Sequence, residues 1–104
     1  MKIINSLTFT GKQAWEALDV AQIEGATVRL HWTDQAYIWH KNTGDEVFVV
    51  IDGQVRMHYL KDNIEHQHIL NSGDICYLQE GEEHVAHPMN GAARILVIEK
   101  KGSI

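Results

Sequence analysis

The stretch EVFVVIDGQVRMHYL, residues 46–60, decides the fold of this chain. It opens with a continuous apolar run from Val47 to Ile51, which is typical of a strand buried on both faces. The Asp52-Gly53 pair that follows predicts a hairpin turn. Beyond this pair, apolar and polar residues alternate as far as Tyr59. A period of two predicts a second strand, with one face toward a core.

The sequence around this stretch has the same character. Short alternating or apolar segments are separated by turns rich in glycine, asparagine and aspartate. The segments expected to form strands are residues 27–32, 37–40, 66–70, 75–78, 84–87 and 93–99. Many short strands at regular spacing are typical of a β-sandwich or barrel. The sequence therefore predicts an all-β fold, with a barrel over about residues 26–99.

A short N-terminal helix is predicted over about residues 11–19. Thr10 and Gln13 have the spacing of a capping box, in which the two side chains satisfy backbone N–H groups at the start of a helix. Trp15 and Leu18 follow at helical spacing. We expect Trp15 to pack against the barrel, because aromatic side chains on helices usually face the core.

The length, the net charge and the cysteine content limit the functions that the chain can have. A length of 104 residues favours a single domain, residues 1–104. The formal charge of −5, with scattered basic residues, argues against a nucleic-acid surface. The single cysteine, Cys76, excludes an intramolecular disulfide and a paired-cysteine zinc site. No apolar run is long enough for a signal peptide or a membrane span, so a cytoplasmic protein is expected.

Three polar residues stand at the ends of predicted strands. His40 ends one strand, Glu46 opens the apolar strand, and His84 opens a later one. A carboxylate on the inward face of a buried strand is costly unless it is paired or bound to a cation. Imidazole and carboxylate groups are ligands for iron, manganese, nickel and zinc. The pattern therefore indicates a site for a divalent metal ion.

These residues fall in two segments that resemble the motifs of the cupin family. Residues 40–53 resemble the first motif, H-x-H-x(3,4)-E-x6-G, and residues 73–84 resemble the second, G-x5-P-x-G-x2-H. The resemblance covers about residues 38–88. It implies a jelly-roll barrel, also described as a double-stranded β-helix, that holds a metal ion inside. It does not imply one activity, because this family hosts many chemistries.

The resemblance implies that His40, Glu46 and His84 match the family's metal ligands. The chain departs from the motifs at Asn42, where the family most often has a second histidine, and at Gln79, where it has proline. An amide oxygen is a poorer ligand for transition metals than imidazole. Two arrangements remain open. Either Asn42 is a weak fourth ligand, or two histidines and one carboxylate hold the ion, a set typical of non-haem iron.

The walls of the barrel pocket are predicted from the same strands. Phe48, Val50, Met57 and Tyr77 are expected to line it, with core packing as the alternative for each. His31 is expected to be a strand histidine that is hydrogen-bonded within the protein, not a ligand.

A homodimer is also predicted. A small jelly roll has sheet edges and aromatic faces that need cover. Strand alternation turns Tyr37 and Trp39 away from the face of His40, so that together with Trp32 they can supply this cover. The resemblance adds that small cupins are often dimers.

Three functions remain open on the sequence alone. The first is a metalloenzyme acting on a small organic molecule, such as a dioxygenase, isomerase or lyase. The second is a barrel that binds a small molecule without turnover, as a sensor or carrier, with or without metal. The third is a barrel whose site residues form a polar cluster without metal. No residue selects among the reactions, and the sequence does not decide whether the chain is an enzyme.

Overall fold

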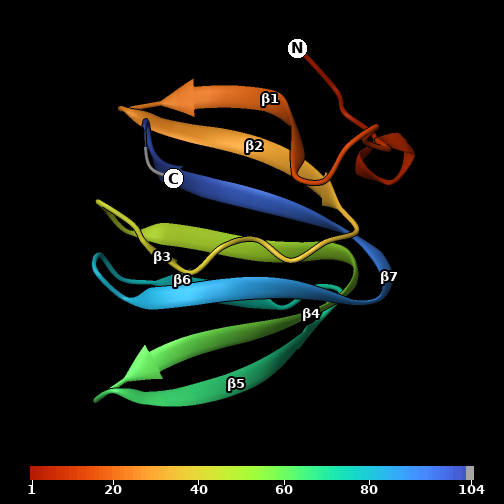
Figure 1. Cartoon of the computed structure of the whole chain (residues 1–104). Coiled ribbons are helices and arrows are strands. Elements are labelled where there is room, and N and C mark those ends of the chain that lie inside the picture. The colour runs from red at the N-terminus through yellow and green to blue at the C-terminus, as the bar shows by residue number, and fades with distance from the viewer. Residues whose placement is uncertain (103–104) are drawn as a thin grey trace.

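The architecture rests on two long strands, β4 (Glu46–Lys61) and β7 (Glu83–Lys100), which pair antiparallel along most of their length. In this computed structural model, which describes residues 1–102, both strands bend near their middle (Figure 1). The two halves of each strand therefore lie in different layers. The N-terminal half of β4 pairs with the C-terminal half of β7, and the remaining halves pair with each other.

Five further strands complete the two layers, and every pairing is antiparallel. The first layer adds β1 (Glu16–Ile23) and β2 (Ala26–Thr33) beside β7, and β6 (Ile75–Leu78) beside β4. The second adds β3 (His40–Lys41) beside β7, and β5 (Ile64–Asn71) beside β4. Two layers joined by shared bent strands form a jelly roll. The predicted all-β jelly-roll fold is confirmed.

Glycine at the bend of β4 explains why the predicted hairpin turn at residues 52–53 is wrong. The strand continues through this point with a shift of register, and Gly53 has a φ of +89°. A Cβ there would lie 2.8 Å from the backbone oxygen of Ala92. The bend therefore requires a residue without a side chain. Residues 88–91, which separate the predicted strands 84–87 and 93–99, form the matching bend inside β7.

The helix predicted over residues 11–19 is also wrong. The only helix among the described residues is a 3-10 turn at Ser6–Thr8, and β1 begins at Glu16. A helix of two turns is marginally stable on its own. As a strand, β1 is stabilised instead by its antiparallel backbone pairing with β2. Trp15 has a φ of +60°, outside the right-handed helical region. No helix in residues 1–102 has the length and apolar character to cross a membrane.

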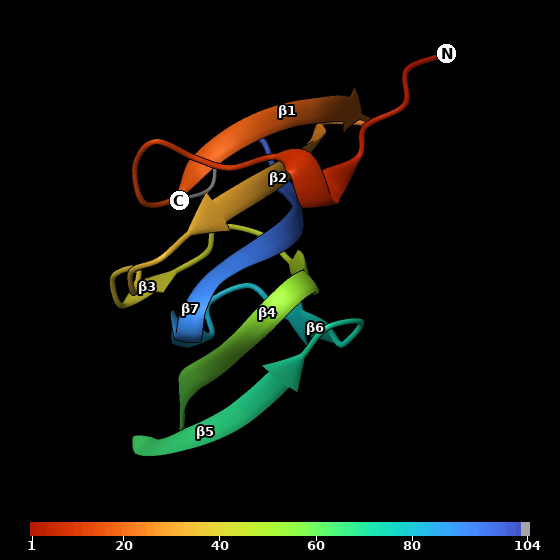
Figure 2. The ribbon, with the colours of Figure 1, turned by 90° about the vertical axis from the view of Figure 1, so that its right-hand side faces the viewer.

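The N-terminal segment lies across the outer face of the first layer (Figure 2). Arg94 of β7 fixes it there: Nε donates to the carbonyl of Phe9 at 2.8 Å, and Nη2 donates to Thr10 Oγ1 at 3.2 Å. Nη1 of the same guanidinium pairs with Asp52 at 2.6 Å. The segment then turns inward at Trp15, whose side chain packs against the core as expected.

The core fills the space between the layers. Inward-facing residues of the long strands and of their neighbours form one cluster: Phe48, Val50, Val55, Met57, Leu70, Leu78, Ala86, Ala93, Ile95 and Val97. Glu46 and His84 belong to the same inward faces, at the end of the barrel where β3 lies. The fold therefore directs both polar side chains into an apolar interior.

The close approach at Gly53 gives a test of the bend. Gly73→Ala adds a side chain at a φ of +92° with nothing within 4 Å, and costs about 1–2 kcal/mol of unfolding free energy. Gly53→Ala adds the collision with Ala92 to the same strain, and costs about 1–3 kcal/mol more. Urea unfolding of both variants measures the difference. Equal losses would contradict the close approach.

Candidate metal centre

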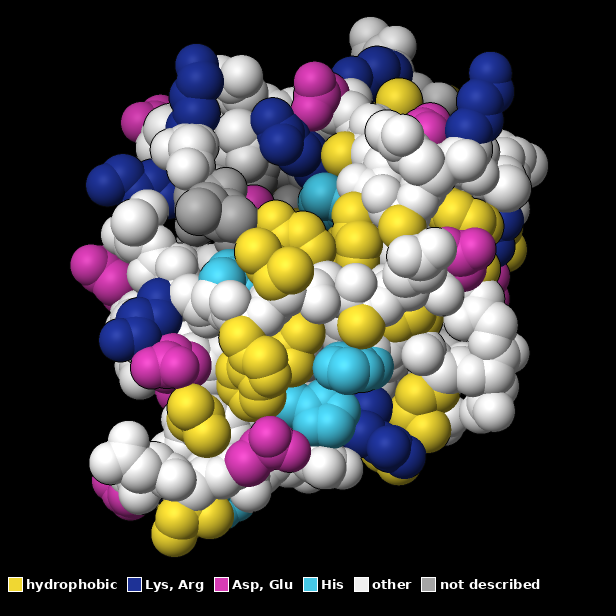
Figure 3. Space-filling view, viewed as in Figure 1, with side chains coloured by type: hydrophobic (Ala, Val, Ile, Leu, Met, Phe, Trp, Pro, Cys, Tyr) yellow, Lys and Arg dark blue, Asp and Glu magenta, His cyan; other side chains and the backbone are white. Residues whose placement is uncertain are grey.

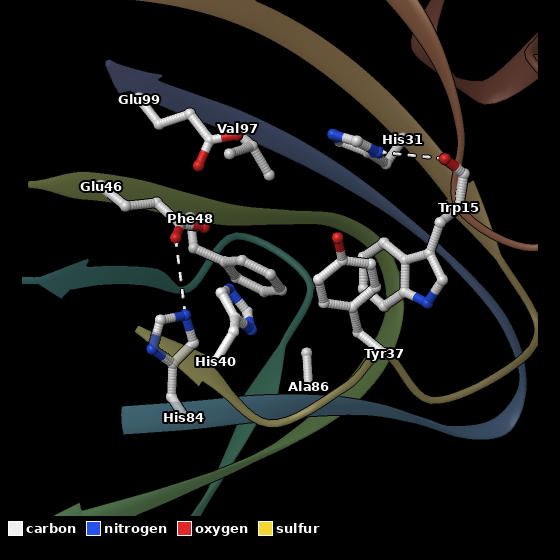
Figure 4. Close-up of a pocket in the computed structure, with 10 residues that line it drawn as sticks. All are labelled: Trp15, His31, Tyr37, His40, Glu46, Phe48, His84, Ala86, Val97 and Glu99. Atoms are coloured by element: carbon white, nitrogen blue, oxygen red, sulfur yellow. Dashed lines mark hydrogen bonds and ion pairs between the residues drawn. The ribbon is translucent and has the colours of Figure 1, made fainter. Parts of the chain in front are cut away.

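Two histidines and one carboxylate meet at one end of the barrel (Figure 4). His40 of β3 and His84 of β7 are direct partners across the strand pair, and their ring centroids lie 4.3 Å apart. Glu46 reaches them from the opposite layer. Within the described part of the chain these three residues form a group whose ligand atoms lie within 4.8 Å of one another. The structure thus brings together the residues predicted from sequence.

Both imidazoles are held in the same orientation by the backbone. Nδ1 of His40 lies 2.8 Å from the carbonyl oxygen of Ile38, and Nδ1 of His84 lies 2.8 Å from that of Glu82. A carbonyl oxygen only accepts hydrogen bonds, so each Nδ1 carries the proton. In the neutral ring Nε2 then has a free lone pair. This is the arrangement in which metal-binding histidines are usually found.

Glu46 and His84 are both almost fully buried, with exposed fractions of 5% and 3%. Burial lowers the pKa of His84, but the nearby carboxylate of Glu46 and the backbone and charge of Glu82 outweigh this effect, so the pKa of His84 is raised. Nε2 of His84 lies 3.6 Å from Oε1 of Glu46. A proton and a divalent cation therefore compete for the same nitrogen, beside the same carboxylate.

Asn42 supports Glu46 and provides a test of whether the site suits a metal ion. Its Nδ2 donates a short hydrogen bond to Oε1 of Glu46. The reverse orientation would set two oxygen atoms against each other, so Nδ2 is the atom that faces the carboxylate. Oδ1 of Asn42 is buried and accepts no hydrogen bond from the described residues. Such an oxygen costs about 1–3 kcal/mol. A cation bound beside Glu46 is a partner that would satisfy it.

Glu99 is a second carboxylate in the same interior. It is the direct strand partner of Glu46, and it lines the same pocket. Burial and the charge of Glu46 raise the pKa of Glu99 to about 7, although Arg29 and His84 partly offset this. The centre thus combines two carboxylates with two imidazoles in a partly dry space, an arrangement that a divalent cation would neutralise.

The three candidate ligands lie at one end of a cavity of about 130 Å³. The cavity is lined by Trp15, His31, Tyr37, His40, Glu46, Phe48, His84, Ala86, Val97 and Glu99 (Figure 4). Of the four predicted wall residues, Phe48 lines this cavity, while Val50 and Met57 lie in the core cluster. Tyr77 does not line this cavity; together with Met57 it lines a second pocket beside β5 and β6. Its strand partner is Val47, it is 57% exposed, and its hydroxyl donates to Asp45.

Tyr37 and His31 line the cavity, although the sequence did not predict this. Alternation was expected to turn Tyr37 away from His40, but residues 34–39 are not a strand, so parity does not apply. The two rings instead meet edge to face, with centroids 5.0 Å apart. His31 is hydrogen-bonded to the carbonyl of Trp15, as expected of a strand histidine, and also faces the cavity. The alternation in residues 27–32 gave no signal for His31, because it shares its face with the polar Thr27 and Arg29, and only the pairing of β2 with β7 shows that this face points inward.

The other histidines lie outside the metal group, and histidine side chains are visible on the molecular surface (Figure 3). His58 and His87 lie together, with ring centroids 4.4 Å apart, and Nδ1 of His58 is 3.3 Å from Glu65. His66 and His68 are exposed on β5. None of these four belongs to the His40–Glu46–His84 group in the described residues.

Comparison with known proteins supports the fold. No protein-family model matches the chain, and no curated protein matches it. Among solved structures it is similar to a cupin-2 domain containing protein from Shewanella frigidimarina, with 23% identity over 88% of this chain and 85% of that chain, and a TM-score of 0.76. A cupin superfamily protein from Desulfitobacterium hafniense gives 12% identity, coverages of 91% and 85%, and a TM-score of 0.77.

A third similar structure is the iron(II) form of HppE. It shares 12% identity with this chain over 80% of this chain and 49% of its own length, with a TM-score of 0.70. The three likenesses confirm that the chain has the cupin fold. At these identities they establish the fold and leave the activity to be argued from the site.

The buried Glu99 predicts a pH dependence of stability in metal-free protein. Between its ordinary pKa of 4.5 and the folded value of about 7, the folded chain binds this proton more tightly than the unfolded chain. Wild type therefore loses stability relative to Glu99→Gln as the pH rises through this window, and the difference levels off above it. Urea unfolding in EDTA from about pH 5 to about pH 8 measures this. A pH-independent difference would contradict it.

Proposed function

We propose that the chain is a metal-dependent cupin-fold protein that takes a small organic molecule into the barrel, at a divalent ion held by His40, Glu46 and His84. One observation carries the proposal: the backbone fixes Nδ1 of both histidines as a donor, which leaves both Nε2 atoms as ligands beside a buried carboxylate. Two histidines that share one tautomer and one neighbouring carboxylate are typical of a metal site.

The donor set suits iron, manganese, nickel or zinc. Three protein ligands leave open positions for a substrate or for water, and Asn42 holds Glu46 through its amide nitrogen. A bound ion supplies Lewis acidity or, if it is iron, chemistry with dioxygen. A dioxygenase, an isomerase and a lyase are each consistent with this site. A cytoplasmic location and a homodimer remain predictions from the sequence.

The residues around the ligands define what the pocket does for a bound molecule. Phe48, Ala86 and Val97 provide apolar walls that exclude water from one side. Glu99 is the strand partner of Glu46 and lines the same cavity. Its carboxyl is therefore placed to accept or donate a proton during a reaction.

A second candidate is a barrel that binds its ligand without turnover. The cavity lining favours this candidate in one respect, because no serine, threonine, cysteine or lysine lines it in the described residues. Nucleophilic catalysis by the protein would depend on the carboxylates, the imidazoles or the Tyr37 hydroxyl. Conversion of a bound molecule by metal-loaded protein, followed by mass spectrometry, separates the two candidates.

Metal content of purified protein tests the proposed site. We expect near-stoichiometric divalent metal in wild type, and at least about a tenfold lower metal affinity in Glu46→Gln and in His84→Ala, because each removes a ligand. Metal should also raise the melting temperature of wild type, since it binds the folded chain. Inductively coupled plasma mass spectrometry and thermal unfolding measure the two effects.

His66→Ala is the matched control, since His66 is an exposed histidine of β5 outside the group. Its metal content should equal that of wild type. If wild type takes up no iron, manganese, nickel or zinc, or if the control variant loses metal as the ligand variants do, the proposed site is wrong.

Asn42 should affect metal affinity through Glu46. Asn42→Ala removes the amide that holds the carboxylate, and we expect about a 10-fold loss of metal affinity. Asn42→His restores an imidazole at this position and should bind at least as tightly as wild type. Titration with a competing chelator measures both values. An Asn42→Ala variant with unchanged affinity would show that this hydrogen bond does not support the ligand.

A further inference from the structure

The cavity has a second polar end, away from the three candidate ligands. His31 of β2 and Tyr37 both point into it, and in Figure 4 the Tyr37 hydroxyl and the Nε2 side of His31 face the same space. Nδ1 of His31 lies 3.4 Å from the carbonyl oxygen of Trp15, so Nδ1 carries the proton and Nε2 is an acceptor. Burial lowers the pKa of His31, which favours the neutral ring.

Tyr37 is held firmly in this position. Its backbone N–H donates to the carbonyl of Ala86 at 3.1 Å, which ties the loop to β7. Its ring meets the ring of Trp15 edge to face at 5.1 Å, and that of His40 at 5.0 Å. The Tyr37 hydroxyl has no hydrogen-bond partner among the described residues, and the side chain lines the cavity. A fixed donor therefore faces the cavity without a protein partner.

The cavity lining thus offers a donor and an acceptor away from the three candidate ligands, and such a pair is complementary to one kind of ligand group. The Tyr37 hydroxyl can donate, and Nε2 of His31 can only accept. A hydroxyl on a ligand accepts the first hydrogen bond and donates the second. A methyl group makes neither, and a carboxylate has no proton for His31. This end of the cavity therefore fits an uncharged hydroxyl best.

The charges around the cavity limit the ligand further. Its charged lining residues are the acids Glu46 and Glu99, and no lysine or arginine of residues 1–102 lines it. The nearest cation on the same face of β2 is Arg29, which is paired with Asp19 at 3.0 Å. The metal ion can balance one negative group of the ligand. A second negative group of the ligand would be buried without a cationic partner.

We propose that this site selects compact hydroxy acids with a single negative charge, whose acid end lies at the metal and whose uncharged hydroxyl end meets His31 and Tyr37. The proposal rests on the proposed metal site. The cavity of about 130 Å³ sets the size, because a cavity of about 150 Å³ accommodates benzene. A ligand of about six to eight non-hydrogen atoms fills it.

Three probes that differ in one group test this selection. Lactate, glycerate and tartronate share a 2-hydroxy acid and carry a methyl, a hydroxymethyl and a second carboxylate respectively. We expect manganese-loaded wild type to bind one enantiomer of glycerate about 5- to 10-fold more tightly than the matching lactate, and tartronate no more tightly than lactate. Isothermal titration calorimetry measures the dissociation constants.

Tyr37→Phe removes only the hydroxyl and keeps the ring. We expect it to abolish the preference for glycerate while leaving the affinity for lactate within about twofold. His31→Phe should reduce the preference in the same way. Metal content is measured on every variant, because neither residue is a proposed ligand and metal should be retained.

The outcomes separate the two proposals. Metal-free wild type overturns the metal site and this inference together. Metal-loaded protein that binds lactate and glycerate equally, or that binds none of the probes, overturns the inference and leaves the metal site standing. Tighter binding of tartronate overturns it as well, and points to Arg29 as the partner of the second carboxylate. Equal losses for both ligands in Tyr37→Phe also contradict it, because the hydroxyl would then have no specific role.

Discussion

The antiparallel pairing of β4 with β7 is the constraint on which the rest of the structure depends. Because both strands bend and pass from one layer to the other, the start of β4 comes to lie across the interior from the start of β7. Glu46 and His84 occupy those two positions, and the pairing of β3 with β7 adds His40. The bend at Gly53 therefore does more than shape the barrel. It sets the distance across which the metal-binding groups meet.

The site concentrates charge in the interior of the barrel. Glu46 and Glu99 face the same interior from neighbouring strands, with His84 as the nearest cationic group. A cavity with apolar walls strengthens each of these interactions and penalises any charge left without a partner. Such a cluster is costly as a purely structural device. It becomes favourable when a divalent cation is added, and this links the stability of the barrel to its function.

The sequence predicts the parts of this structure that depend on local pattern. Alternation and turn residues identify the strands, and the spacing from His40 to Glu46 and on to His84 identifies the site. What it misses depends on tertiary contacts. Residues 11–19 have a helical spacing that the free edge of β2 overrides, and Tyr37 enters the cavity from a loop to which no periodicity applies. The pairing of β6 with β4, which turns Tyr77 outward, is likewise set by register between distant segments.

The most direct test of the account is the position of the ion in a crystal of manganese-loaded protein, located by anomalous X-ray scattering. The account predicts one strong peak about 2.0–2.3 Å from Nε2 of His40, Nε2 of His84 and a carboxylate oxygen of Glu46. Both Nδ1 atoms should still donate to their backbone carbonyls. A peak bound through Nδ1, a peak at surface histidines alone, or no peak in the barrel would contradict the central claim.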